Sequence, residues 1–111
     1  MRIFMNRRFA RFARKESISE VKLRETVDRA IRGLIDADLG SGIIKQRLSR
    51  TGQGRSSGYR SGIAIRFGQN AFFIYGFAKN EKEDLAPDEL LQYRLAPLAF
   101  FHSQMRLSSS F

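Results

Sequence analysis

Basic side chains gather in the middle of the sequence in a pattern that could act on a phosphate. Arginine binds phosphate through two parallel hydrogen bonds, and a lysine crowded by other cations has a lowered pKa and can serve as a base. Such a cluster could bind a phosphodiester and stabilise the charge that develops during its cleavage. Alternatively, it could bind the phosphodiester without cleaving it. The segment 45–60, KQRLSRTGQGRSSGYR, has no carboxylate and carries five cations, which are Lys45, Arg47, Arg50, Arg55 and Arg60.

The charge of the whole chain supports a polyanionic partner. The 111 residues carry a net charge of +9, and the block 39–80 contains seven basic residues and no acidic one. This predicts a strong positive field over one part of a single small domain. The chain has no cysteine, which removes disulfides and Cys-based zinc sites and fits a cytoplasmic protein. The apolar runs are only a few residues long, so no segment is expected to span a membrane.

Other chemistries find little support in the residues. The glycine-rich TGQGRSSG lacks the spacing of a P-loop and lies between two expected strands. His102 is the only histidine, without partners at the spacing of metal ligands or of a catalytic triad. The sequence therefore predicts no metal and no cofactor.

Helical periodicity predicts two helices near the start and one near the end. After a short strand at 2–4, Phe9 and Phe12 recur one turn apart within a helix over 6–15. A second helix is expected to begin at a capping box formed by Ser17 and Glu20 and to end at Gly40. Its apolar stripe comprises Leu23, Val27, Ala30, Ile31 and Leu34. A third helix over 86–96, with Pro87 in its first turn, is expected to turn Leu90, Leu91 and Leu95 inward.

Alternation with a period of two predicts strands at 43–48, 59–67 and 71–79, joined by a loop at 50–58 and a turn at 68–70. The fold class is therefore α+β, with two N-terminal helices packed on a twisted antiparallel sheet and a C-terminal helix. Residues 1–96 form the expected domain. Residues 97–111 form a tail in which Phe100 and Phe101 pack onto the domain before a disordered end.

The strand pattern also predicts which side chains share a face. One face of the sheet is expected to be at least partly open, with room left by the small residues Gly62 and Ala64. The cations on this face are Lys45, Arg47, Arg60 and Arg66.

Several segments together resemble the RelE/HigB-type toxins of type II toxin–antitoxin systems. They are SSGYR at 56–60, the preceding KQRL, FARFARKE near the start and GFAKNEKEDL after the hairpin. The resemblance covers about residues 3–96. It implies a RelE-like fold and a metal-independent endoribonuclease that cleaves mRNA, usually on the ribosome. It also implies an antitoxin partner, whose acidic segment we expect to mask the basic face.

The resemblance implies roles for particular residues. Lys45 and Arg47 match two sheet-face lysines of RelE, Arg60 matches an arginine thought to stabilise the transition state, and Lys79 lies in the segment that carries a second catalytic arginine. Two positions depart from the family pattern, since Asn80 and Ala86 stand where RelE has that arginine and a catalytic tyrosine. The chemistry could then be shared by Arg50, Arg55 or Tyr75. The expected RNA-binding residues are Arg50, Arg55, Arg66 and Tyr75.

Two alternatives remain open on the sequence. The chain could be a basic nucleic-acid-binding module without catalytic activity, or an inhibitor of another target like the ParE branch of the superfamily. The basic face, laid out for phosphates, argues against the second.

Overall fold

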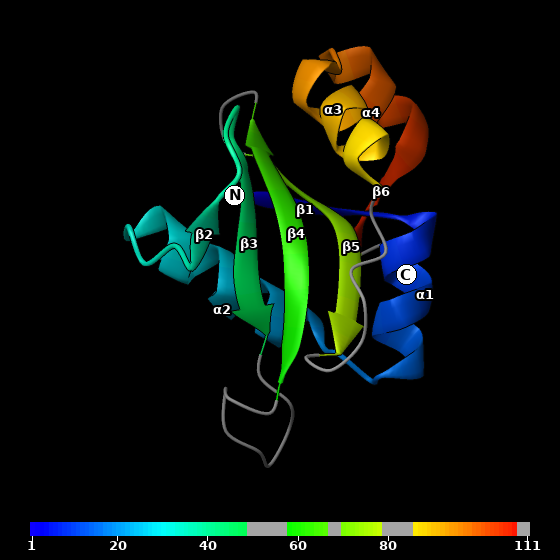
Figure 1. Cartoon of the computed structure of the whole chain (residues 1–111). Coiled ribbons are helices and arrows are strands. Elements are labelled where there is room, and N and C mark those ends of the chain that lie inside the picture. Colours follow the sequence, from blue (N-terminus) through cyan, green and yellow to red (C-terminus); the bar gives the residue numbers. More distant parts are fainter. Residues whose placement is uncertain (49–57, 67–69, 79–85, 109–111) are drawn as a thin grey trace.

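The computed structural model describes residues 1–48, 58–66, 70–78 and 86–108. A sheet forms the centre of the molecule, with helices on both of its faces (Figure 1). The α+β class expected from the sequence is confirmed. Arg50, Arg55, Lys79 and Asn80 lie outside the described residues.

The sheet has six strands in the order β2-β3-β4-β5-β1-β6. All neighbouring pairs are antiparallel except β1 and β5, which are parallel. A parallel pair needs a long crossover, and here α1, α2 and three strands separate β1 from β5 in the chain. The strands are β1 (Arg2–Asn6), β2 (Ala37–Asp38), β3 (Ile43–Leu48), β4 (Tyr59–Arg66), β5 (Asn70–Ala78) and β6 (Met105–Leu107).

The first helix, α1 (Arg7–Lys15), follows β1 directly. The buried Asn6 fixes this junction: its side-chain oxygen accepts from Phe9 N at 2.8 Å and caps the helix. Its amide nitrogen donates to Ile74 O in β5 at 2.8 Å. Phe9 and Phe12 then lie over Gly76, where a Cβ would come within 2.6 Å of the Phe12 ring. Glycine at this position lets α1 approach the sheet closely.

The second helix, α2 (Glu20–Ile31), differs from expectation at both ends. Its N-cap is Ser19, whose hydroxyl accepts from Lys22 N, so the predicted capping box at Ser17 is wrong. The helix ends nine residues before Gly40, and Gly33 then adopts a positive φ of 87°. Ile31 and Leu34 are therefore not part of the buried stripe, and their side chains are 54% and 58% exposed.

One core lies between α1, α2 and the first face of the sheet. It includes Leu23 and Val27 of α2, Ile44 and Leu48 of β3, and Ile63 of β4. This confirms the predicted facing of β3, in which Ile44 and Leu48 point away from Lys45 and Arg47.

A second core covers part of the opposite face. It is built by α3 (Pro87–Leu95), α4 (Leu98–Gln104) and β6, which pack on Phe72 and Ala64. Residues predicted as a tail thus extend the domain: Phe101 is fully buried and β6 pairs with β1. The inward facing predicted for Leu91 and Leu95 is wrong, because these side chains are 51% and 75% exposed.

Candidate nucleic-acid interface

Three cations meet where β3 and β4 lie side by side. The register pairs Arg47 with Arg60 and Lys45 with Gly62, so all three charged side chains start from one face of the sheet. Directly opposed residues in an antiparallel pair have Cβ atoms about 5 Å apart. We call Lys45, Arg47 and Arg60 the cation cluster. Arg47 is exposed, and Lys45 and Arg60 are half-buried.

The backbone of Arg47 is held by side chains from the segment around α2. Its N–H donates to Asp36 Oδ2 at 2.7 Å, and its carbonyl accepts from Arg29. Arg29 and Asp36 themselves form an ion pair at 3.8 Å. These contacts fix β3 at Arg47, two residues beyond Lys45, where the pairing with β2 ends. The guanidinium of Arg47 points to the face of the sheet opposite α2.

Beneath the cluster, Gln46 locks β3 onto α2. This fully buried side chain donates to Thr26 O at 3.3 Å and to Leu34 O at 3.2 Å, and it accepts from Asp36 N at 2.8 Å. Such a network sets the register of β3, and a shift by one residue would turn Lys45 and Arg47 into the core. Sequence reasoning missed Gln46; its signal is a polar residue at a position where alternation expects an apolar one.

On the neighbouring strand, Tyr59 fixes the residue next to Arg60. The Tyr59 ring is buried, meets Phe12 edge-on at 5.3 Å, and its hydroxyl donates to Glu16 Oε1 at 2.7 Å. Among the described residues, Arg60 makes one weak hydrogen bond, from Nη1 to Tyr59 O at 3.4 Å. The side chain of Arg60 is thus positioned through its strand.

A β-bulge in β5 shapes the floor beside the cluster. Gly62 pairs with Tyr75 but Ile63 pairs with Phe73, so Ile74 is the extra residue. The bulge reverses the alternation and brings Tyr75 and Phe77 to the face of the cations, with ring centroids 5.9 Å apart. The Tyr75 ring fills the space above Gly62, where a Cβ would lie 2.0 Å from it.

This floor changes the expectation for Tyr75. Its side chain is fully buried, so in this structure its ring is closed to a stacked base. The room that the sequence predicts beside Arg60, on account of Gly62, is occupied by Tyr75. The ring is better described as a support for the cluster than as an RNA contact.

Arg66 also differs from the expectation, because its guanidinium is engaged at the far end of β4. It donates to Ser41 O at 2.6 Å, to Arg94 O at 2.7 Å and to Ala96 O at 3.4 Å, and lies 5.6 Å from the Phe101 ring centroid. Burial lowers the pKa of the Arg66 guanidinium. Arg66 therefore fastens α3 and α4 to the sheet and is not brought together with the cation cluster.

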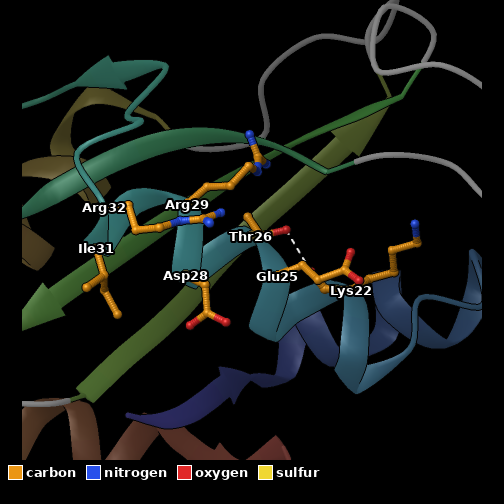
Figure 2. Close-up of a pocket in the computed structure, with 7 residues that line it drawn as sticks. All are labelled: Lys22, Glu25, Thr26, Asp28, Arg29, Ile31 and Arg32. Carbon is orange, nitrogen blue, oxygen red and sulfur yellow. Dashed lines mark hydrogen bonds between the residues drawn. The ribbon is translucent and has the colours of Figure 1, made fainter.

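Other features of the described chain lie apart from the cation cluster. A hollow of about 620 Å³ lies beside α2, and its lining mixes carboxylates (Glu25, Asp28) with cations (Arg29, Arg32) (Figure 2). Within the described ranges, no three His, Asp or Glu side chains gather as metal ligands. None of the described helices has the length and apolar character needed to cross a membrane.

Comparison with known protein families agrees with the geometry. The family model described as the RelE toxin of the RelE/RelB toxin–antitoxin system matches residues 1–109. A comparison with curated proteins finds no match. The family match covers nearly the whole chain, including α4 and β6 at its end. The chain therefore belongs to the RelE family of toxins of toxin–antitoxin systems.

Proposed function

We propose that this toxin is an endoribonuclease that cleaves mRNA on the ribosome, in the cytoplasm, without a metal or cofactor. Its cognate antitoxin would bind the toxin, mask the cation cluster with acidic residues and so keep the toxin inactive. The observation that carries the proposal is the pairing of Arg47 with Arg60, next to Lys45, on a face whose strands are locked in register.

Each cation has a role in this proposal. Cleavage within RNA requires loss of the 2′-hydroxyl proton, stabilisation of the phosphorane oxygens and neutralisation of the leaving 5′-oxygen. Lys45 lies on the same face as the two arginines, two residues before Arg47, and its amine suits the role of base by position. Arg60 suits the phosphorane oxygens, which its planar fork can bind in a bidentate manner. Arg47, directly opposite, would hold the adjacent phosphate, and the leaving 5′-oxygen would take its proton from water.

The proposal also includes residues outside the described ranges. Lys79, Arg50 and Arg55 follow or precede strands that end near the cluster, and we propose that Lys79 assists catalysis while Arg50 and Arg55 contact RNA. Ala86 lies just before α3 and supplies no side chain for acid–base chemistry. A base or acid must then come from elsewhere, and Lys45 is the described residue that fits.

The test is primer extension on mRNA incubated with translating ribosomes and the purified toxin. The wild type should produce discrete cleavage sites, and a variant with Lys45→Ala, Arg47→Ala and Arg60→Ala should produce none. A matched variant with Arg2→Ala, Arg24→Ala and Arg32→Ala removes the same charge from exposed positions and should retain cleavage. RNA binding without cleavage by the wild type would identify a noncatalytic binding module. Inhibition of a target other than mRNA would instead favour a ParE-like role.

A further inference from the structure

A second basic surface lies between α1 and the C-terminal segment, away from the cation cluster. It is a groove of about 390 Å³ with α1 as one wall and the end of α4 with β6 as the other. Ala10 and Met105, both buried, also line it. We call it the α1 groove. Its charged and polar lining consists of Arg7, Arg11, Arg14, His102, Gln104 and Arg106.

Three arginines of the α1 groove form a row on one side of the helix. Arg7, Arg11 and Arg14 are spaced by four and three residues, so they share a face and extend over about 10 Å along the axis. All three are exposed. Across the groove, Arg106 pairs with Met5 in the sheet, which places it on the same face of the sheet as α1.

These charges are not explained by the stability of the fold. The ion pairs found in the described part of the chain involve Arg8, Arg24 and Arg29, and none involves the groove arginines. Arg7 occupies the first turn of α1, where the positive end of the helix dipole disfavours a cation by about 0.3–1 kcal/mol. Arg14 lies in the last turn, where the dipole favours a cation, so the dipole accounts for one end of the row and not for the other. A row of arginines that extends to the first turn, without ion pairs among the described residues, indicates a ligand with negative charge.

The lining favours a phosphate backbone over an acidic protein segment. Among the described residues that line the α1 groove there is no carboxylate and no exposed apolar anchor. Protein partners usually bind through buried aromatic or aliphatic anchors, whereas arginine, serine and glutamine are typical donors to phosphate oxygens. Gln104 adds such a donor beside Arg106, whereas the Ser103 hydroxyl donates to Phe100 O at 2.7 Å.

We propose that the α1 groove binds the sugar–phosphate backbone of a second RNA segment, without regard to its base sequence. The strands β5 and β1 separate β6, at the edge of the sheet, from the strands of the cation cluster, and α1 packs on the opposite face. One short run of phosphates cannot contact both surfaces. The choice of RNA as the polyanion rests on the proposed function, since a toxin that cuts mRNA on a ribosome meets a second RNA there. Two sites on one rigid domain would increase affinity through their effective concentration.

The test measures binding instead of cleavage. All variants are built on a background with Lys45→Gln, Arg47→Gln and Arg60→Gln, which removes the cation cluster. Fluorescence anisotropy with a labelled oligouridylate then follows affinity against salt concentration. Adding Arg7→Gln, Arg11→Gln and Arg14→Gln should reduce the magnitude of the log–log salt slope by about 2, at about 0.7 for each lost phosphate contact. The control adds Arg2→Gln, Arg24→Gln and Arg32→Gln, which changes the net charge equally and should leave the slope unchanged.

Other outcomes would overturn the inference. Equal slopes for the groove variant and the control, or no RNA binding by the background protein, would show that the α1 groove does not hold phosphates. Displacement of the oligouridylate by a polyglutamate peptide at equal charge concentration would assign the groove to an acidic protein segment instead. A groove-dependent slope in a toxin that fails to cleave mRNA would leave the inference standing and refute the proposed function alone. Circular dichroism melting confirms that each variant is folded.

Discussion

The two ends of β4 carry arginines on the same face of the sheet, but these residues have opposite surroundings. Within the described ranges, Arg60 makes a single weak hydrogen bond, and it is positioned beside Arg47 and Lys45. Arg66, six residues later, donates to three carbonyl groups and lies against the ring of Phe101. In the first case the cation is one that we propose to bind RNA. In the second it takes part in the fold.

This difference arises from α3 and α4, whose position over β4 cannot be predicted from the sequence of the strand. α3 and α4 cover the Arg66 end of the face: the carbonyls of Arg94 and Ala96, at the end of α3, accept from its guanidinium, and the Phe101 ring of α4 lies against it. Arg66 is half-buried, and Ser41, Arg94 and Ala96 supply acceptors for the donors that its guanidinium withdraws from water. Figure 1 shows α3 and α4 together beyond one end of the sheet, away from the lower part of β3 and β4. Whether a cation is functional therefore depends on what covers its position.

Removal of the Phe101 ring should have the largest effect on stability, because this ring helps to hold α3 and α4 over the Arg66 end of the sheet. Phe101 is fully buried against Phe72, at a ring-centroid distance of 4.6 Å. Phe101→Ala should lower the free energy of unfolding by about 3–5 kcal/mol, the usual range for a buried aromatic ring. Urea denaturation measures it. Leu95→Ala, at a side chain 75% exposed, is the control and should change stability little. Equal losses for the two variants would contradict the second core.

Arg60→Ala should affect activity and leave the fold intact. Loss of one donor to a developing oxyanion typically reduces the rate about 10²–10³-fold. The half-buried side chain has few contacts, so the free energy of unfolding should change by no more than about 0.5 kcal/mol. Single-turnover cleavage of mRNA on ribosomes gives the first number and thermal unfolding the second. Cleavage at the wild-type rate would remove Arg60 from the mechanism.

The sequence predicts the cation cluster well because it depends on local alternation. Lys45 and Arg47 alternate with Ile44 and Leu48, and the same period places Arg60 opposite Arg47 once the two strands pair. The parallel pairing of β1 with β5 is not local, and no short-range pattern contains it. Tyr75 is expected from the sequence to bind RNA, and its burial over Gly62 is not predicted for another reason: the bulge at Ile74 reverses the alternation of β5, and one extra residue leaves no signal in hydrophobic periodicity.

The C-terminal end of α2 shows a similar limit. Ile31 and Leu34 continue the helical stripe in the sequence, yet the helix stops at Ile31, and Leu34 O then accepts from the buried Gln46. The tertiary hydrogen bond decides the position of this segment, against its local propensity. Sequence periodicity alone therefore overestimates both the helix and its buried face.

Arg66→Ala is the counterpart of Arg60→Ala, with a smaller effect on stability than Phe101→Ala. Hydrogen bonds from a charged donor contribute about 1.5–3 kcal/mol, and the carbonyls left behind can partly hydrate. We expect a loss of about 1–3 kcal/mol in the free energy of unfolding and an unchanged cleavage rate for the folded fraction. Arg66→Lys should recover only part of the stability, because one ammonium cannot reach carbonyls of Ser41, Arg94 and Ala96 together. A large loss of cleavage without a loss of stability would instead make Arg66 an RNA-binding residue.

The smallest effect is expected from Tyr59→Phe, which tests how β4 presents Arg60. The substitution keeps the ring that packs on Phe12 and removes only the hydrogen bond to Glu16. Because Glu16 is half-exposed and can bind water, the cost should be about 0.5–1.5 kcal/mol, whereas Tyr59→Ala also loses the ring and should cost about 3–5 kcal/mol. If the hydroxyl only stabilises the fold, Tyr59→Phe cleaves mRNA at the wild-type rate below its melting temperature. A reduced rate with normal stability would mean that the hydrogen bond to Glu16 sets the position of Arg60. In that case a toxin with Glu16→Gln, which keeps the acceptor oxygen, should retain more activity than one with Glu16→Ala.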